Sequence, residues 1–149
     1  MKILCQRNPK WSTIKMGSSK LTLGKFGCTT TCISMLSDYF GCYRSPEELA
    51  HNANNYTKSG LVIWQNIIFN KMSVGWREYK RDDKKIQEYL KDPNKAVILQ
   101  VDNGSHWIVA LRPTILGKDY VCADPWTGKK CLAIKDYHNI TGATYFHRI

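Results

Sequence analysis

The sequence lacks any long run of apolar residues. The apolar stretch nearest the start, Ile3-Leu4-Cys5, is followed directly by Gln6-Arg7, and no segment approaches the ~18 consecutive apolar residues that a membrane-spanning helix needs. This stretch is also shorter than the apolar core of a secretory signal peptide, which has about 7–15 residues. We therefore expect no membrane span and no signal peptide, and a location in the cytoplasm of the cell that makes the protein.

Low-complexity segments and repeats of a fixed period are absent too, which excludes disordered, fibrous and solenoid proteins. The 149 residues are 43% hydrophobic, and a chain of this length buries roughly two-thirds of its unfolded surface in one core. We expect a single domain over residues 1–149, present as a monomer.

Acidic residues are scarce, above all in the first quarter of the chain. Lys and Arg number 22 against 12 Asp and Glu, which gives a net charge of +10, and the first acidic residue is Asp38. The basic residues that precede it are Lys2, Arg7, Lys10, Lys15, Lys20 and Lys25. A positive field attracts anionic partners, of which an anionic cell-wall polymer or an acidic peptide fits best, and we do not expect a nucleic-acid partner. A basic surface that only maintains solubility explains the same charge, so both interpretations stay open.

The sequence also has no feature that directs the protein to an oxidising compartment, where disulfides persist. Its six cysteines, which allow three disulfides, are Cys5, Cys28, Cys32, Cys42, Cys122 and Cys131. Because a secretory signal is missing and the core is large enough without covalent links, we expect these thiols to be reduced.

The first half of the sequence predicts helices. Apolar residues recur at helical spacing over residues 28–40, and residues 45–48 form a capping box with Pro at the first helical position. Helical patterns also cover residues 61–72 and 83–90, and residues 73–80 alternate as a possible strand.

The second half predicts strands at residues 96–101, 106–111, 119–124, 130–135 and 142–149, which turn residues separate. Helices followed by antiparallel strands indicate an α+β fold, with N-terminal helices packed on a C-terminal antiparallel sheet.

Three segments together indicate a nucleophilic cysteine site. Cys28 follows Gly27 on the first turn of a predicted helix, and a thiol becomes a strong nucleophile when a helix N-terminus and an imidazole favour its thiolate. His106 begins one predicted strand and Asp124 ends the next, so antiparallel pairing would place the carboxylate where it can orient the imidazole. Asp102 is an alternative to Asp124, although it lies across a turn only four residues before His106.

An oxyanion hole needs hydrogen-bond donors that point at the developing negative charge. The backbone N–H of Cys28 is one candidate, and the side-chain amide of Gln6 is the second. Gln6 can equally be a residue that caps a strand, so its role stays open here.

Four segments resemble, in order, the C39-like branch of the papain-like cysteine peptidases, which is related to the peptidases that remove double-glycine leaders from bacteriocins. They are residues 6–11 (QRNPKW), 23–31 (LGKFGCTTT), 106–109 (HWIV) and 120–125 (YVCADP). The gap between the first two segments is longer than in the leader-processing branch, and the sequence contains no transporter.

The resemblance implies a papain-like fold and a role for each site residue. Cys28 is implied as the nucleophile, His106 as the general base and acid, Asp124 as the residue that orients His106, and Gln6 as the oxyanion donor. It implies a cysteine peptidase that cleaves a peptide or isopeptide bond through a thioester, with no cofactor and no metal.

The substrate follows from charge and from the preference of these relatives for Gly-rich sites. We expect a bacterial or phage endopeptidase for cell-wall cross-bridges, released by lysis or carried in a virion, with a narrow cleft walled by Trp107 and Trp126. A protein substrate, such as a Gly-Gly leader or a Gly-Gly conjugate, is the alternative.

Two other classes of protein compete with a peptidase. Cys28 and Cys32 lie four residues apart on one helix face and could, with Cys42 and His51, bind zinc. The chain could also be a catalytically silent binding module that keeps the fold.

Overall fold

A single antiparallel sheet organises the computed structural model, which describes residues 1–67 and 71–149. Its strands are β1 (Met72–Glu78), β2 (Lys95–Val101), β3 (His106–Pro113), β4 (Tyr120–Asp124), β5 (Lys129–Leu132) and β6 (Ile140–Arg148). They lie in the order β1-β6-β2-β3-β4-β5, and every neighbouring pair is antiparallel. The predicted antiparallel sheet is confirmed, and β1 extends it with a strand that precedes the fourth α-helix.

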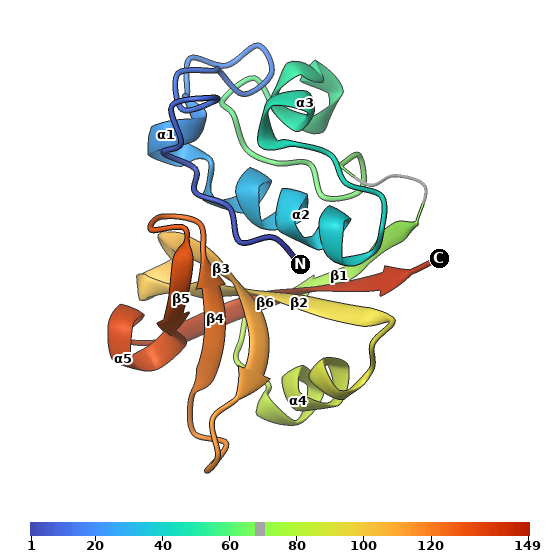
Figure 1. Ribbon diagram of the computed structural model, residues 1–149, viewed down its shortest axis with the longest axis vertical. Helices are drawn as coiled ribbons and strands as arrows, with labels where there is room; N and C mark the ends of the chain where they lie inside the picture. The colour runs from blue at the N-terminus through green and yellow to red at the C-terminus, as the bar shows by residue number, and fades with distance from the viewer. Residues whose placement is uncertain (68–70) are drawn as a thin grey trace.

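The helices cover both faces of this sheet. They are α1 (Leu23–Phe26), α2 (Cys28–Tyr39), α3 (Pro46–His51), α4 (Asp83–Lys91) and α5 (Ala133–Tyr137). Figure 1 shows α1, α2 and α3 on one side of the sheet and α4 on the other. The α+β class is confirmed, whereas α5, which lies between β5 and β6, departs from the expected order of helices first and strands afterwards. Among the described residues, no helix is long and apolar enough to cross a membrane.

The two faces are buried by alternate residues of the central strands, since successive side chains on a strand point to opposite sides. On β2, Ile98 packs with Leu36 of α2, while Val97 and Leu99 pack with Ile86 of α4. All five of these side chains are at most 1% exposed. Burial on both faces explains why β2 reads as a continuous apolar run in the sequence.

The helices predicted at residues 28–40, 45–48 and 83–90 are confirmed as α2, α3 and α4. The capping box works as expected, because the Ser45 hydroxyl accepts a hydrogen bond from the backbone N–H of Glu48 at 3.1 Å.

The helix predicted over residues 61–72 is wrong. Residues 61–67 form bends and turns, and Met72 already begins β1, while residues 68–70 of the prediction lie outside the described residues. The segment is held by a bridge between Tyr56 and Val62 and by the bond from Ile63 N–H to the Asn55 carbonyl at 2.8 Å. Its apolar side chains therefore reach the core from an irregular loop. Their spacing along the sequence resembles that of a helix although no helix forms.

The strand predicted over residues 130–135 ends at Leu132, where α5 begins. The carboxylate of Asp119 accepts hydrogen bonds from the backbone N–H groups of Ile134 at 2.8 Å and Lys135 at 3.1 Å. These amides are the unpaired donors of the first turn of α5, so a residue from the preceding strand region caps the helix. Nothing local to residues 130–135 signals this cap.

Candidate functional site

Cys28 is the first residue of α2, and Gly27 makes this position possible. A Cβ atom on Gly27 would lie 2.5 Å from the carbonyl oxygen and 2.8 Å from the Cα of Leu23 in α1. The close approach of α1 to the start of α2 therefore requires glycine. Because the first N–H groups of a helix have no acceptor within the helix, this packing places Cys28 among free backbone donors.

Gly27→Ala is expected to destabilise the protein by about 1–3 kcal/mol, because the backbone of Leu23 must move to admit the methyl group. Thermal and denaturant unfolding measure this loss. An unchanged free energy of unfolding would show that α1 is not tightly packed against Gly27.

His106 and Asp124 lie side by side at one edge of the sheet. His106 begins β3 and Asp124 ends β4, and these strands pair in antiparallel register through Val109 and Ala123. His106 Nε2 lies 2.9 Å from Asp124 Oδ1. The structure thus brings together the imidazole and the carboxylate that the sequence singled out.

Asp124 is 1% exposed, and both of its carboxylate oxygens accept hydrogen bonds. Oδ1 also accepts a hydrogen bond from the backbone N–H of Trp126 at 2.9 Å, and Oδ2 accepts one from the Tyr137 hydroxyl. Burial alone would raise the pKa of Asp124, but the bonds from His106, Tyr137 and Trp126 outweigh it and lower the pKa. Asp124 is therefore an ionised acceptor held in one orientation.

Tyr137 is the residue of this cluster that sequence reasoning missed. Its ring centroid lies 4.8 Å from that of His106, and its hydroxyl bonds Asp124, so it contacts both members of the pair. It belongs to α5, which the sequence predicted as strand and loop, and no local signal marks it.

His106 has a raised pKa. Burial lowers the pKa, but hydrogen bonds with the Asp124 carboxylate and the Cys28 side chain outweigh it and raise the value from 6.5 to about 9. With Nε2 bonded to Asp124, Nδ1 is the ring nitrogen left for Cys28. Because folding raises this pKa, the cluster stabilises the fold fully below pH 6.5, and the contribution is lost as the pH rises through about 9.

Gln6 is buried beside Cys28, with 1% of its surface exposed. Its backbone N–H donates to the Pro125 carbonyl at 2.7 Å, which ties the N-terminal segment to the turn after Asp124. Its side-chain Nε2 donates to the carbonyl of Gly24 at 3.2 Å and, more weakly, to that of Leu23 at 3.5 Å. Its Oε1 is buried and has no partner in the described part of the chain.

Cys28, His106 and Gln6 border one cleft, which has a volume of about 340 Å³. Its lining residues are Gln6, Lys25, Phe26, Cys28, Asp102, Ser105, His106, Trp126 and Tyr137. The Asp102 carboxylate accepts a hydrogen bond from the Ser105 hydroxyl at 3.1 Å, whereas the carboxylate bonded to His106 is that of Asp124. The structure therefore favours Asp124 over Asp102 as the partner of the imidazole.

The two tryptophans expected to wall the cleft lie in different places. Trp126 is 41% exposed and lines the cleft itself. Trp107 is only 8% exposed, and its ring packs edge-on against Trp64 with centroids 5.3 Å apart. It lines a neighbouring cavity of about 190 Å³ that also reaches Cys28. Cys28 therefore borders two hollows, of which Trp126 lines the first and Trp107 lines the second.

The other cysteines differ from Cys28, which lies against His106. All six thiols are free. Cys32 is fully buried and donates to the Trp107 carbonyl at 3.4 Å, and burial raises its pKa well above the ordinary value. Within residues 1–67 and 71–149, no group of three or more His, Cys, Asp or Glu side chains could hold a metal ion, so the zinc set with Cys42 and His51 is not assembled.

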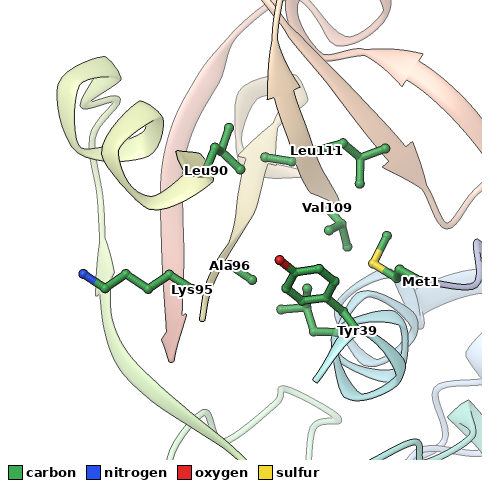
Figure 2. A pocket seen from close by; sticks show the side chains of 9 residues that line it. Met1, Tyr39, Leu90, Lys95, Ala96, Val109 and Leu111 are labelled. Carbon is green, nitrogen blue, oxygen red and sulfur yellow. The ribbon is translucent and has the colours of Figure 1, made fainter. Parts of the chain in front are cut away.

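A separate hollow of about 180 Å³ lies between α2, the end of α4 and strands β2 and β3. Figure 2 shows Tyr39, Val109 and Leu111 around it, with the side chain of Lys95 pointing away from them. Its lining has no Cys, His, Asp or Glu. Of its two ionisable side chains, Tyr39 donates its hydroxyl to the Pro93 carbonyl at 3.1 Å, and Lys95 points away from the hollow. The chemistry of the described residues is concentrated in the cleft at Cys28.

Comparison with known families agrees with this site. A family model described as "Peptidase C39 family" matches residues 25–140, more than half of the chain. The matched span includes Cys28, His106 and Asp124 and leaves out Gln6. A search of curated proteins finds no match.

Proposed function

Because the chain belongs to the peptidase C39 family, whose members are cysteine peptidases, we propose that Cys28, His106 and Asp124 are its catalytic triad. The observation that carries this proposal is the linked set of contacts from Cys28 through His106 to the buried Asp124. The antiparallel sheet with α2 packed on one face fits a papain-like fold, and we propose that residues 1–149 form one such domain.

The reaction follows from these contacts. The Cys28 thiolate attacks the scissile carbonyl carbon, and the C=O electron pair moves to oxygen as an oxyanion. His106, which is protonated at neutral pH because its pKa is about 9, gives its proton to the departing amine as the C–N bond breaks. The acyl group remains on sulfur as a thioester. Water then attacks it with His106 as the base, which releases the acid and restores the thiolate.

Gln6 has a place in this scheme as an oxyanion donor, beside the backbone N–H of Cys28. An amide nitrogen carries two protons, and the 3.5 Å contact with the Leu23 carbonyl is weak, so one N–H can serve a substrate oxygen. The other N–H donates to the Gly24 carbonyl at 3.2 Å, and this bond holds the amide in place.

Gln6→Ala is expected to lower kcat by ~10²–10³, which is the usual cost of removing one oxyanion donor. The measurement is kcat together with the melting temperature, because Gln6 also contacts α1. A normal kcat would show that another donor serves the oxyanion, and a large loss of stability would point to a structural role.

For the substrate we propose a cell-wall cross-bridge of bacterial peptidoglycan, cleaved by an enzyme that lysis releases or a virion carries. The support is the net charge of +10 and the position of Lys25 on the rim of the cleft, which favour a polyanionic target. The second candidate is a protein with a Gly-Gly site. It is favoured by the family match and by the smaller cavity of about 190 Å³ beside Cys28, which Trp107 lines.

The test incubates the protein with purified sacculi of several wall chemistries and, separately, with Gly-Gly peptides, and measures newly freed amines. The Cys28→Ala variant is the control in each arm. Amine release from sacculi alone supports the wall substrate, and cleavage of the peptides alone replaces it with a protein substrate. No release in either arm favours a silent binding module.

A further inference from the structure

A second hollow adjoins the cleft on the side of Trp126. It has a volume of about 430 Å³, and its lining residues are Arg7, Ser12, Thr13, Thr22, Gly24, Lys25 and Trp126. It shares Lys25 and Trp126 with the cleft that holds Cys28 and His106. The two hollows therefore adjoin at Lys25 and Trp126, which a substrate bound at the thiol would pass to reach the second hollow. We refer to it below as the Arg7–Lys25 hollow.

The Arg7–Lys25 hollow carries positive charge alone. Arg7 and Lys25 are its two charged residues, and both are exposed. Neither forms an ion pair within the described part of the chain. Two cations that line one hollow without a counter-ion repel each other, and an anion bound in the hollow would relieve that repulsion.

Arg7 is held in a fixed orientation by Trp126. Its Nε donates to the Trp126 carbonyl at 2.9 Å, and its guanidinium carbon lies 4.3 Å from the centre of the Trp126 ring. Both contacts leave the two terminal NH₂ groups free. A guanidinium fixed in this way loses little conformational entropy when it binds, and its paired N–H groups match the geometry of a carboxylate.

The position of His106 indicates which side of the scissile bond lies nearer to this hollow. The residue that protonates the departing amine must lie on the leaving-group side of the thiol. His106 lines the cleft that leads to the Arg7–Lys25 hollow, and it does not line the cavity that contains Trp107. The position of His106 therefore favours the leaving-group side for the hollow.

We propose that the Arg7–Lys25 hollow binds a carboxylate carried by the leaving-group side of the substrate. This carboxylate belongs either to an acidic side chain or to a free C-terminus shortly after the scissile bond. The assignment of the side rests on the proposed function, because it uses His106 as the acid. The binding of the carboxylate itself can be measured without turnover.

The experiment uses the Cys28→Ala protein and two matched pairs of N-acetylated peptides. One pair is Gly-Gly-Glu amide and Gly-Gly-Gln amide, and the other is Gly-Gly-Gly with a free or an amidated C-terminus. Dissociation constants are read from the NMR shift of the Trp126 indole N–H. In at least one pair, the charged peptide is expected to bind roughly fivefold more tightly than the neutral one, and the ratio should shrink as salt rises.

Adding Arg7→Gln or Lys25→Gln should bring this ratio close to one. Lys118→Gln is the matched control, since Lys118 is an exposed cation in the turn between β3 and β4, which lies far from α1 in Figure 1. Using the ratio within each variant removes general effects of the substitution. Because Arg7→Gln and Lys25→Gln test the same hollow, the experiment can still be interpreted if one of these variants fails to fold.

A preference for Glu over Gln identifies an acidic side chain as the ligand, and a preference for the free terminus identifies a C-terminal carboxylate. Equal binding within both pairs overturns the proposal. So does a ratio that survives both Arg7→Gln and Lys25→Gln, or one that falls equally with Lys118→Gln. Since Cys28→Ala cannot turn over, these results are independent of the peptidase assignment, which the sacculus and peptide assays test separately.

Discussion

Cys28→Ala is expected to abolish hydrolysis, with a loss of turnover on the order of 10⁶-fold, while the melting temperature stays nearly unchanged. The thiolate is the atom that bonds the substrate, and no neighbouring group can replace it. Cys28 is only partly buried, at the start of a helix whose packing depends on other residues, so removing its sulfur costs about 1 kcal/mol or less. Steady-state hydrolysis and thermal unfolding are measured on the same preparation.

Cys32→Ala is the matched control, because it removes a thiol one turn further along α2. Cys32 is 0% exposed and bonds the Trp107 carbonyl, so its loss leaves a small cavity and should cost about 1–2 kcal/mol of stability with turnover retained. The reverse pattern, with activity lost in Cys32→Ala and kept in Cys28→Ala, would contradict the assignment of Cys28 as the nucleophile.

The pairing of His106 with Asp124 could be predicted because each residue sits in a local pattern of its own. A helix start places Cys28, and two strand ends separated by a turn place His106 and Asp124. Antiparallel pairing of consecutive strands is the commonest arrangement, so the contact required no long-range knowledge.

The rest of the site depends on contacts between distant segments. Tyr137 reaches Asp124 because Asp119 caps α5 from an earlier part of the chain. The burial of Trp107 has a similar cause. Its ring packs against Trp64, which belongs to a loop that the sequence predicted as a helix. This contact helps to bury Trp107, which is 8% exposed. Contacts between segments this far apart in the chain cannot be predicted from composition or from the periodicity of apolar residues.

Asp124→Ala is expected to lower kcat/KM on the order of 10⁴-fold. It removes the acceptor that fixes the His106 ring and favours its protonated form. It also leaves the Trp126 N–H and the Tyr137 hydroxyl without their acceptor, and both groups are partly buried, so each loss costs about 1 kcal/mol. Stability and turnover should therefore fall together in this variant.

Asp124→Asn separates orientation from charge. The amide oxygen can take the place of Oδ1 and accept from His106 Nε2–H and the Trp126 N–H, while the amide nitrogen donates to the Tyr137 oxygen. The hydrogen bonds and most of the stability are then kept, and part of the activity lost in Asp124→Ala returns.

The negative charge does not return, and the pH profile reports its loss. In the wild-type protein, turnover should fall as the pH rises through about 9, because His106 then loses the proton that the leaving amine needs. Without the carboxylate, burial still lowers the pKa of His106, and the negative charge of Asp124 no longer raises it. The alkaline limb of kcat/KM should therefore move to lower pH in Asp124→Asn. If that limb stayed near pH 9, the carboxylate would not be what keeps the imidazole protonated, and Asp124 would serve only to hold the ring in place.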